Sequence, residues 1–221
     1  MSPRSVLPPP PPPVEIRAWP DRDALLADRS FLLGGLVKAH IGPGRLGLLW
    51  LWGVVAAVGW SFIGTAFITF EESFDAVSAI AGVVMLAMGA AALIPAVVLL
   101  VVGLRRDAAV RRLLTQWGEL DPDPARDAGL RLPGLSLVWL LTSFVLGALG
   151  LYACVVVPAG AVRGHDTYGL MALIMGLGFL AWTVGLVGVF KAFWHRRWIL
   201  RTLTGTAAPV PLAQQGGGAH R

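Results

Sequence analysis

The residues best suited to chemistry are carboxylates that lie close together in the sequence. Glu71 and Glu72 form a pair, Asp75 follows three residues later, and His165 and Asp166 lie in a second short connection. Carboxylates and a histidine brought together could bind a divalent cation. A paired-glutamate protease would continue with an arginine and distant histidines, whereas the next charge here is acidic. We interpret Glu71 and Glu72 as a solvated helix end and predict no metal site.

Three aspartates have the spacing of a calcium-binding loop. Asp121, Asp123 and Asp127 would occupy its first, third and seventh positions. That loop needs a glycine at the sixth position and a glutamate at the twelfth, where this chain has Arg126 and Leu132. The sequence therefore predicts no calcium site here.

Serines in the apolar stretches lack the partners that nucleophilic catalysis requires. Such a site needs a general base near the hydroxyl, and no histidine or lysine lies in the stretches that contain Ser61, Ser78, Ser136 and Ser143. The chain also has no H-E-x-x-H sequence, phosphate-binding loop or dinucleotide fingerprint. The sequence predicts a protein that is not an enzyme, with no catalytic residues and no cofactor.

Four stretches of the chain contain no charged residue. They have 25, 29, 23 and 23 residues, and each exceeds the ~18 apolar residues that identify a membrane-spanning helix. Over the whole chain 14% of the residues are charged, against about 25% in soluble proteins. The sequence therefore predicts an all-α integral membrane bundle of four transmembrane helices, within a domain of residues 46–190, whose spans are 46–70, 76–104, 135–157 and 168–190.

Basic residues are distributed unevenly among the segments that separate these spans. Segments 1–45, 105–134 and 191–221 hold 17 of the 18 lysines and arginines, and the two short connections hold only Arg163. Because basic residues near span ends remain on the cytoplasmic side, both termini are predicted to be cytoplasmic. The net charge of +5 follows from this asymmetry and does not indicate nucleic-acid binding. We expect a multi-pass protein of the cell (cytoplasmic) membrane.

The segments outside the spans differ in composition. Residues 1–20 contain six consecutive prolines and are predicted to form a disordered leader. Residues 21–45 combine leucines at helical spacing with a charged face, which predicts an amphipathic helix and turn at the inner membrane surface. Residues 105–134 form the cytoplasmic loop, and the tail 191–221 is basic near the membrane and then disordered.

Two arginine clusters follow the second and fourth spans. Trp139, Trp194 and Trp198 fall at the same level, where aromatic rings favour the membrane interface. Each arginine near an anionic leaflet contributes on the order of 1 kcal/mol. We predict that the clusters come together and bind anionic lipid headgroups of the bilayer through Arg105, Arg106, Arg111, Arg112, Arg196, Arg197 and Arg201.

Small residues recur at helical spacing in the first and third spans. Small side chains let membrane helices approach closely, since lipid provides no hydrophobic force between them. The predicted helix-packing faces are Gly53, Ala57, Ser61 and Gly64, and Ser143, Gly147, Gly150 and Cys154. Similar short sequences at an offset of 85 to 89 residues leave open an internal duplication of a helical hairpin.

The function indicated by these features is non-enzymatic. We predict a scaffold or accessory subunit of a membrane complex, with a membrane-protein partner or a second copy of the chain as its companion. The alternative is a small transporter or channel that acts as an oligomer. A transporter would need a polar pore lining, and the spans offer only hydroxyls such as those of Thr65, Thr69, Thr142 and Thr183.

Overall fold

The fold was obtained as a computed structural model of the whole chain. The structure describes residues 7–13, 19–72, 75–121, 123–131, 133–162 and 167–204. Every regular element within these residues is helical, which confirms the predicted all-α class. Parts of the predicted leader, the predicted disordered tail beyond residue 204, and the connection with His165 and Asp166 lie outside the described residues.

Aspartates cap the start of two of the helices. The carboxylate of Asp21 accepts a hydrogen bond from the backbone N–H of Ala24 at 2.7 Å, and Asp75 accepts one from Ser78 at 2.6 Å. Each bond satisfies one donor that a helix N-terminus leaves free. In chain order the elements are α1 (Arg22–Ile41), α2 (Pro43–Glu72), α3 (Ala76–Gly118), α4 (Pro124–Asp127), the 3-10 helix η2 (Ala128–Arg131), α5 (Pro133–Ala159) and α6 (Tyr168–Thr204).

Among the described residues, α2, α3, α5 and α6 are long and apolar enough to cross a membrane. They contain 30, 43, 27 and 37 residues. At about 1.5 Å per residue, α3 is far longer than the ~30 Å hydrocarbon core of a bilayer. Both α3 and α6 continue as single helices beyond the charge-free stretches that end at Leu104 and Phe190. By helix length and hydropathy, the chain is a multi-pass membrane protein.

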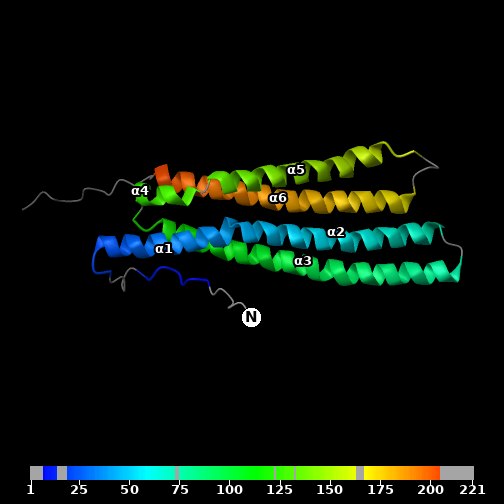
Figure 1. The fold of residues 1–221 in the computed structure, drawn as a ribbon, viewed down its shortest axis with the longest axis horizontal. Helices are drawn as coiled ribbons and strands as arrows, with labels where there is room; N and C mark the ends of the chain where they lie inside the picture. Colours follow the sequence, from blue (N-terminus) through cyan, green and yellow to red (C-terminus); the bar gives the residue numbers. More distant parts are fainter. Residues whose placement is uncertain are drawn as a thin grey trace, which may run out of the picture.

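The four long helices lie side by side in the order α5, α6, α2, α3 (Figure 1). Helices α2 and α3 form one antiparallel hairpin, and α5 and α6 form the other. The hairpins meet along α2 and α6, so α3 and α5 are the outer helices of the array.

Large apolar side chains cover the outward faces of α3 and α5. Val83 on α3 is 59% exposed, and Phe144 on α5 is 65% exposed. Apolar surface this extensive is rare on soluble monomers and marks contact with a membrane or a partner. In the hydrocarbon of a bilayer the same side chains can face outward without a free-energy cost, because lipid tails are equally apolar.

A second region, which we call the cap, lies at the end of the array where Figure 1 shows α1 and α4. The cap comprises α1, residues 105–118 of α3 and 119–121 after it, α4, η2, residues 133–140 of α5 and residues 191–204 of α6. Unlike the spans, it has a core of large side chains, formed by Leu33, Leu36, Val37, Ile41, Val110, Leu114, Trp117, Leu120, Trp139, Ala192, Trp198 and Ile199.

The cap core contains residues that the sequence pattern assigned to the membrane surface. Trp139 is fully buried and Trp198 is 8% exposed, so neither is an interfacial anchor, because both indole rings pack inside the cap. Leu32, Leu33 and Leu36 of α1 also face this core, whereas Phe31 is 79% exposed. Contact of segment 21–45 with the membrane surface stays a prediction. Within the leader, the Pro9 carbonyl accepts a hydrogen bond from Trp117 Nε1 at 3.2 Å.

Candidate functional site

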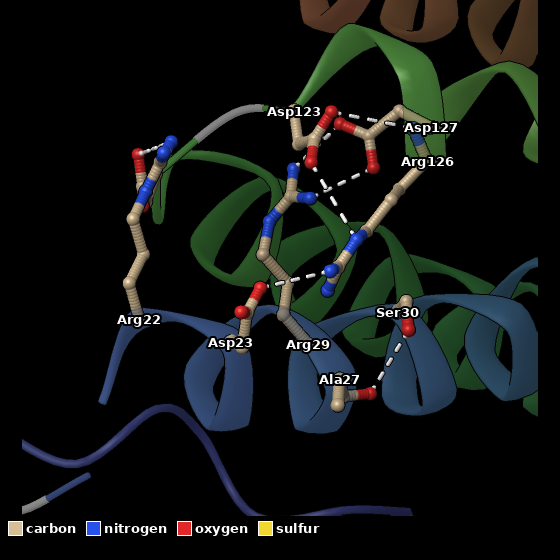
Figure 2. Close-up of polar contacts among 9 residues, drawn as sticks. Arg22, Asp23, Ala27, Arg29, Ser30, Asp123, Arg126 and Asp127 are labelled. Carbon is tan, nitrogen blue, oxygen red and sulfur yellow. Dashed lines mark hydrogen bonds and ion pairs between the residues drawn. The ribbon is translucent and has the colours of Figure 1, made fainter. Parts of the chain in front are cut away.

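A buried ion pair joins α1 to α4 inside the cap (Figure 2). The two Nη atoms of Arg29 donate to the two carboxylate oxygens of Asp127 at 2.7 and 2.9 Å. The side chains are only 1% and 2% exposed. Paired N–H···O bonds between ions are stronger than neutral hydrogen bonds and fix the relative orientation of the two groups. The pair therefore fastens the first helix to the connection between the two hairpins.

Backbone carbonyls at the end of α3 accept the further hydrogen bonds of the Arg29 guanidinium. Its Nε donates to the Trp117 carbonyl at 3.1 Å, and Nη2 donates to the Gly118 carbonyl at 3.3 Å. Carbonyls in the last turn of a helix have no intrahelical partner and carry partial negative charge. Arg29 thus holds three elements together, since α1, α3 and α4 all contribute to its environment.

Further ion pairs at the surface surround the buried pair of Arg29 and Asp127. They involve the other two aspartates of the spacing that resembles a calcium-binding loop. Arg22 Nε donates to Asp121 at 2.6 Å, and the bond holds the pKa of Asp121 below its ordinary value. Arg126 lies 3.6 Å from Asp123 and donates to Asp23 of α1 at 2.9 Å (Figure 2). The third aspartate of that spacing is the buried partner of Arg29. Each carboxylate is therefore paired with an arginine.

A second buried ion pair links α3 to α6. Lys191 Nζ lies 2.6 Å from Asp107 Oδ2, and the two side chains are 5% and 8% exposed. The ammonium also lies 4.8 Å from the centre of the Trp139 ring, which provides a cation–π contact from α5. Trp139 Nε1 in turn donates to the Ile41 carbonyl at 2.9 Å, so the network reaches the end of α1.

Two buried histidines lie beside this second pair. His40 and His195 are 0% and 1% exposed, and their ring centres are 6.5 Å apart. His40 packs edge-on against Trp194 at 5.2 Å, and His195 lies 6.1 Å from Trp198. None of the four ring nitrogens has a hydrogen-bond partner within the described residues. The two rings therefore act as parts of an aromatic cluster, and no third metal-binding side chain accompanies them in the described chain.

The arginine clusters both lie in the cap. Arg111 reaches from α3 to α6, where its guanidinium lies 5.5 Å from the Phe190 ring and 5.9 Å from the Trp194 ring. Arg106 and Arg111 are half-buried. The exposed members are Arg105, Arg112, Arg196, Arg197 and Arg201. The structure thus places both clusters in one region, and their binding of anionic lipid stays a prediction.

The small face expected on α5 lies against α6. Its members are Ser143, Gly147, Gly150 and Cys154. A Cβ added at Gly150 would clash with the backbone N of Trp182 and lie 2.5 Å from the Gly178 carbonyl oxygen. A Cβ at Gly185 would lie 2.6 Å from the backbone N of Gly147. Backbones approach this closely only where both helices lack side chains.

The small residues of α2 pack against two neighbouring helices, α6 and α3. The expected members are Gly53, Ala57, Ser61 and Gly64. Cβ atoms added at Gly53 and Gly64 would contact Val184 at 3.4 Å and Leu173 at 2.6 Å, so these glycines face α6. Ala57 and Ser61 are half-buried. The contact with α3 uses Gly59 instead, where an added Cβ would lie 2.9 Å from the Gly89 carbonyl oxygen.

Sequence reasoning missed the buried charges of the cap. Arg29, Asp107, Asp127 and Lys191 lie outside the charge-free stretches, so a search confined to intramembrane charges does not find them. A signal was present for two of them. Asp107 is an acid within an arginine-rich run, and Lys191 is one of only two lysines in the chain.

The comparisons with known proteins add no relative. No protein-family model matches the sequence, and neither a curated protein nor a solved structure matches it significantly. The class of protein therefore rests on helix length, hydropathy and the geometry described above. What the cap does has to be inferred from its own residues.

Proposed function

We propose that this chain is a non-enzymatic scaffold or accessory subunit of a membrane complex. The observation that carries the proposal is the cap, a folded region tied to both hairpins by buried ion pairs. Side chains held by packing and hydrogen bonds present a fixed surface to a partner. The exposed arginines of the cap and the apolar faces of the outer helices are the surfaces available for assembly.

We propose that the cap lies on the cytoplasmic side of the cell membrane. Support comes from the basic residues, since 17 of 18 lie in the segments that this orientation makes cytoplasmic. Reporter fusions at Ser73 and Gly164 should report the outer side, and fusions at Asp123 and Gly217 the inner side. A reporter on the opposite side at any of the four positions would refute the orientation.

The exposed arginines are proposed to bind anionic lipid headgroups. Guanidinium groups beside an anionic leaflet attract phosphate, and five of the seven predicted contacts are exposed. Replacing Arg196, Arg197 and Arg201 by Gln should reduce the retention of cardiolipin or phosphatidylglycerol in native mass spectrometry and leave phosphatidylcholine unchanged. Arg126→Gln, which removes a cap arginine outside the clusters, is the matched control. Unchanged anionic lipid in the triple variant would refute this role.

The scaffold proposal is tested by isolating the protein from native membranes in mild detergent. We expect a second polypeptide in constant stoichiometry, and we expect the Arg196→Gln/Arg197→Gln variant to lose it. Glu119→Gln is the control, because Glu119 is an exposed cap residue outside the arginine clusters.

A different outcome would favour the alternative function. If the purified protein is a homo-oligomer without a second polypeptide, and reconstituted vesicles conduct ions or take up solute, the chain is a small transporter or channel. That result would contradict the scaffold proposal.

A further inference from the structure

Residues 7–13, which we call the proline segment, lie against the cap. They comprise Leu7 and six consecutive prolines, which favour the extended polyproline II helix. Figure 1 shows the segment as the dark blue trace next to α1, and Leu7 packs against the cap core. Its half-buried residues are Leu7, Pro8, Pro11 and Pro12. Its exposed residues are Pro9, Pro10 and Pro13. The cap thus covers part of the proline segment and leaves the rest accessible.

A tryptophan at the end of α3 binds this segment through a hydrogen bond. Trp117 Nε1 donates to the Pro9 carbonyl at 3.2 Å, and Trp117 is 2% exposed. A polyproline II helix forms no internal hydrogen bonds, so its carbonyls can accept bonds from another element. A buried indole N–H normally has a partner, and here the proline segment provides it. The cap therefore binds a proline helix in the way that aromatic-lined grooves bind proline-rich peptides.

A hollow of about 570 Å³ lies at the N-terminal end of the proline segment. Of that segment, Leu7 and Pro8 line the hollow, and the other walls come from α1 and from Arg106 of α3. Its apolar lining includes Phe31, which is 79% exposed. Its volume is in the range of about 300–1,000 Å³ that is usual for ligand-binding pockets. The binding surface thus extends beyond the residues that Trp117 holds.

The charge of the hollow does not match the chain's own leader. Among the described residues that line it, the charged ones are Lys38 and Arg106, which each contribute one positive charge. The charged residue that precedes Leu7 in the sequence is Arg4. Like charges repel, whereas an acidic residue would be attracted by both basic side chains. A proline-rich segment with an acidic residue before its leucine–proline sequence would therefore fit the cap better than the leader does.

We propose that the cap is a receptor for a proline-rich segment of a partner protein, with an acidic residue before a leucine–proline sequence. The chain's own proline segment occupies the receptor, and the partner's segment displaces it. A tethered ligand competes at a high effective concentration, so the partner has to gain from contacts that the leader does not make. Lys38 and Arg106 provide those contacts. This inference rests on the proposed scaffold function, because it names the kind of polypeptide that the scaffold holds.

Two matched peptides test the receptor on the unaltered chain in detergent. One has the sequence of residues 4–13, the other carries Arg4→Glu, and both bear the same fluorophore at the C-terminus. Fluorescence anisotropy should show roughly tenfold tighter binding of the Arg4→Glu peptide, because repulsion is replaced by attraction. Equal affinities would show that the surface accepts the leader of a second copy as readily as an acidic partner, and would overturn the proposal. Failure of both peptides to bind would also overturn it.

Substitutions in the hollow test where the acidic residue binds. In Lys38→Gln/Arg106→Gln the affinities of the two peptides should differ by less than roughly twofold, because the charge that distinguishes them is removed. Arg112→Gln/Arg197→Gln is the matched control, since it removes two exposed cap arginines that do not line the hollow. The control should keep the full difference. A difference that persists in Lys38→Gln/Arg106→Gln would overturn the proposal.

A leader variant tests whether the peptide takes the place of the proline segment. Leu7→Ser weakens the packing of that segment against the cap core and should raise the affinity for the Arg4→Glu peptide roughly fivefold, because competition falls. Pro10→Ala, at an exposed position of the same segment, is the control and should leave the affinity unchanged. Unchanged or weaker affinity in Leu7→Ser would show that the peptide binds elsewhere, and would overturn the proposal.

Isolation of the chain from native membranes distinguishes this inference from the scaffold proposal. If a second polypeptide is isolated in constant stoichiometry but neither peptide binds, the scaffold function stands and the receptor is refuted. If the Arg4→Glu peptide binds and Leu7→Ser strengthens its binding while no second polypeptide is isolated, the receptor stands and the scaffold function is refuted.

Discussion

The hairpins of this protein are held together differently in the spans and in the cap. In the spans the backbones approach one another at glycines such as Gly150 and Gly185, and large apolar side chains point outward. In the cap the same helices pack against one another through large side chains such as Trp139 and Leu114, which are fully buried. Buried ion pairs occur in the cap and join its elements.

The difference follows from the surroundings of each region. In lipid, burying a leucine gains little, so helices associate through close backbone contact and van der Waals packing. Outside the hydrocarbon, burial of apolar surface stabilises at about 25 cal/mol per Å², and large side chains become the better core. A residue type that stabilises one region should therefore be neutral or harmful in the other.

The largest effect is expected from breaking the buried ion pair of the cap. Asp127→Asn leaves the Arg29 charge buried without its partner, which should cost about 3–5 kcal/mol. Chemical denaturation should show the loss, and hydrogen exchange should locate it in α1 and the end of α3 rather than in the spans. Arg126→Gln, on the exposed pair, should cost at most about 1 kcal/mol.

The double variant Arg29→Met/Asp127→Leu sharpens this prediction. It removes both charges together and should recover much of the lost stability, because no ion remains buried alone. If Asp127→Asn and Arg126→Gln have equal effects, the buried pair does not fasten the cap.

The next largest effect is expected where backbones touch in the spans. Gly150→Leu forces α5 from α6 and should cost about 3 kcal/mol, since its side chain meets backbone atoms of Trp182 and Gly178. Gly147→Leu should cost less, because a Cβ there meets only Gly185 at 3.9 Å. Unfolding in mixed micelles measures both.

The matched control for the glycine variants is Leu149→Phe. Leu149 is 61% exposed on the outward face, and added bulk there should have no effect. Equal losses for Gly150→Leu and Leu149→Phe would show that the small face of α5 is not an interface.

A smaller effect is expected from the tryptophan that connects the cap to α5. Trp139→Phe keeps an aromatic ring but removes the hydrogen bond to the Ile41 carbonyl and weakens the contact with Lys191. We expect a loss of about 1–2 kcal/mol in the thermal or chemical stability of the cap. Trp50→Phe, at a partly exposed site in α2, should change stability by less than about 0.5 kcal/mol. Equal effects would show that the hydrogen bond and the cation–π contact of Trp139 do not stabilise the cap.

The smallest effect is expected at the exposed pair of Arg22 and Asp121. Because Arg22 holds the pKa of Asp121 below its ordinary value, the pair stabilises the protein above the ordinary pKa of about 3.9. This contribution is lost as the pH falls through the lowered pKa. Asp121 has a φ of 32°, and Asn tolerates that backbone conformation, so Asp121→Asn removes the charge without adding strain.

Melting temperatures between about pH 6 and pH 2 check this pair. The wild type should melt slightly above Asp121→Asn near pH 6, and the difference should vanish at the acid end. A difference that is constant over this range would show that the charge of Asp121 is not responsible.

The sequence by itself determined the class of fold. Long charge-free stretches such as 76–104 are too apolar to remain in water and long enough to cross a bilayer, so their number and helical state follow from composition. The spacing of Ser143, Gly147 and Gly150 also indicated one helix face, because the period of an α-helix is fixed. Local chemistry was sufficient for both inferences.

Only the tertiary structure decided which residues meet. Arg29 and Asp127 are 98 positions apart in the sequence, and Asp107 and Lys191 are 84 positions apart. Because of these separations, no local sequence pattern predicts either ion pair. The cap core likewise combines side chains from α1, α3, α5 and α6. Each of these segments alone looks like a charged flank of a membrane span. Long-range contacts turn them into a folded region, because burial and charge pairing depend on which segments the chain brings together.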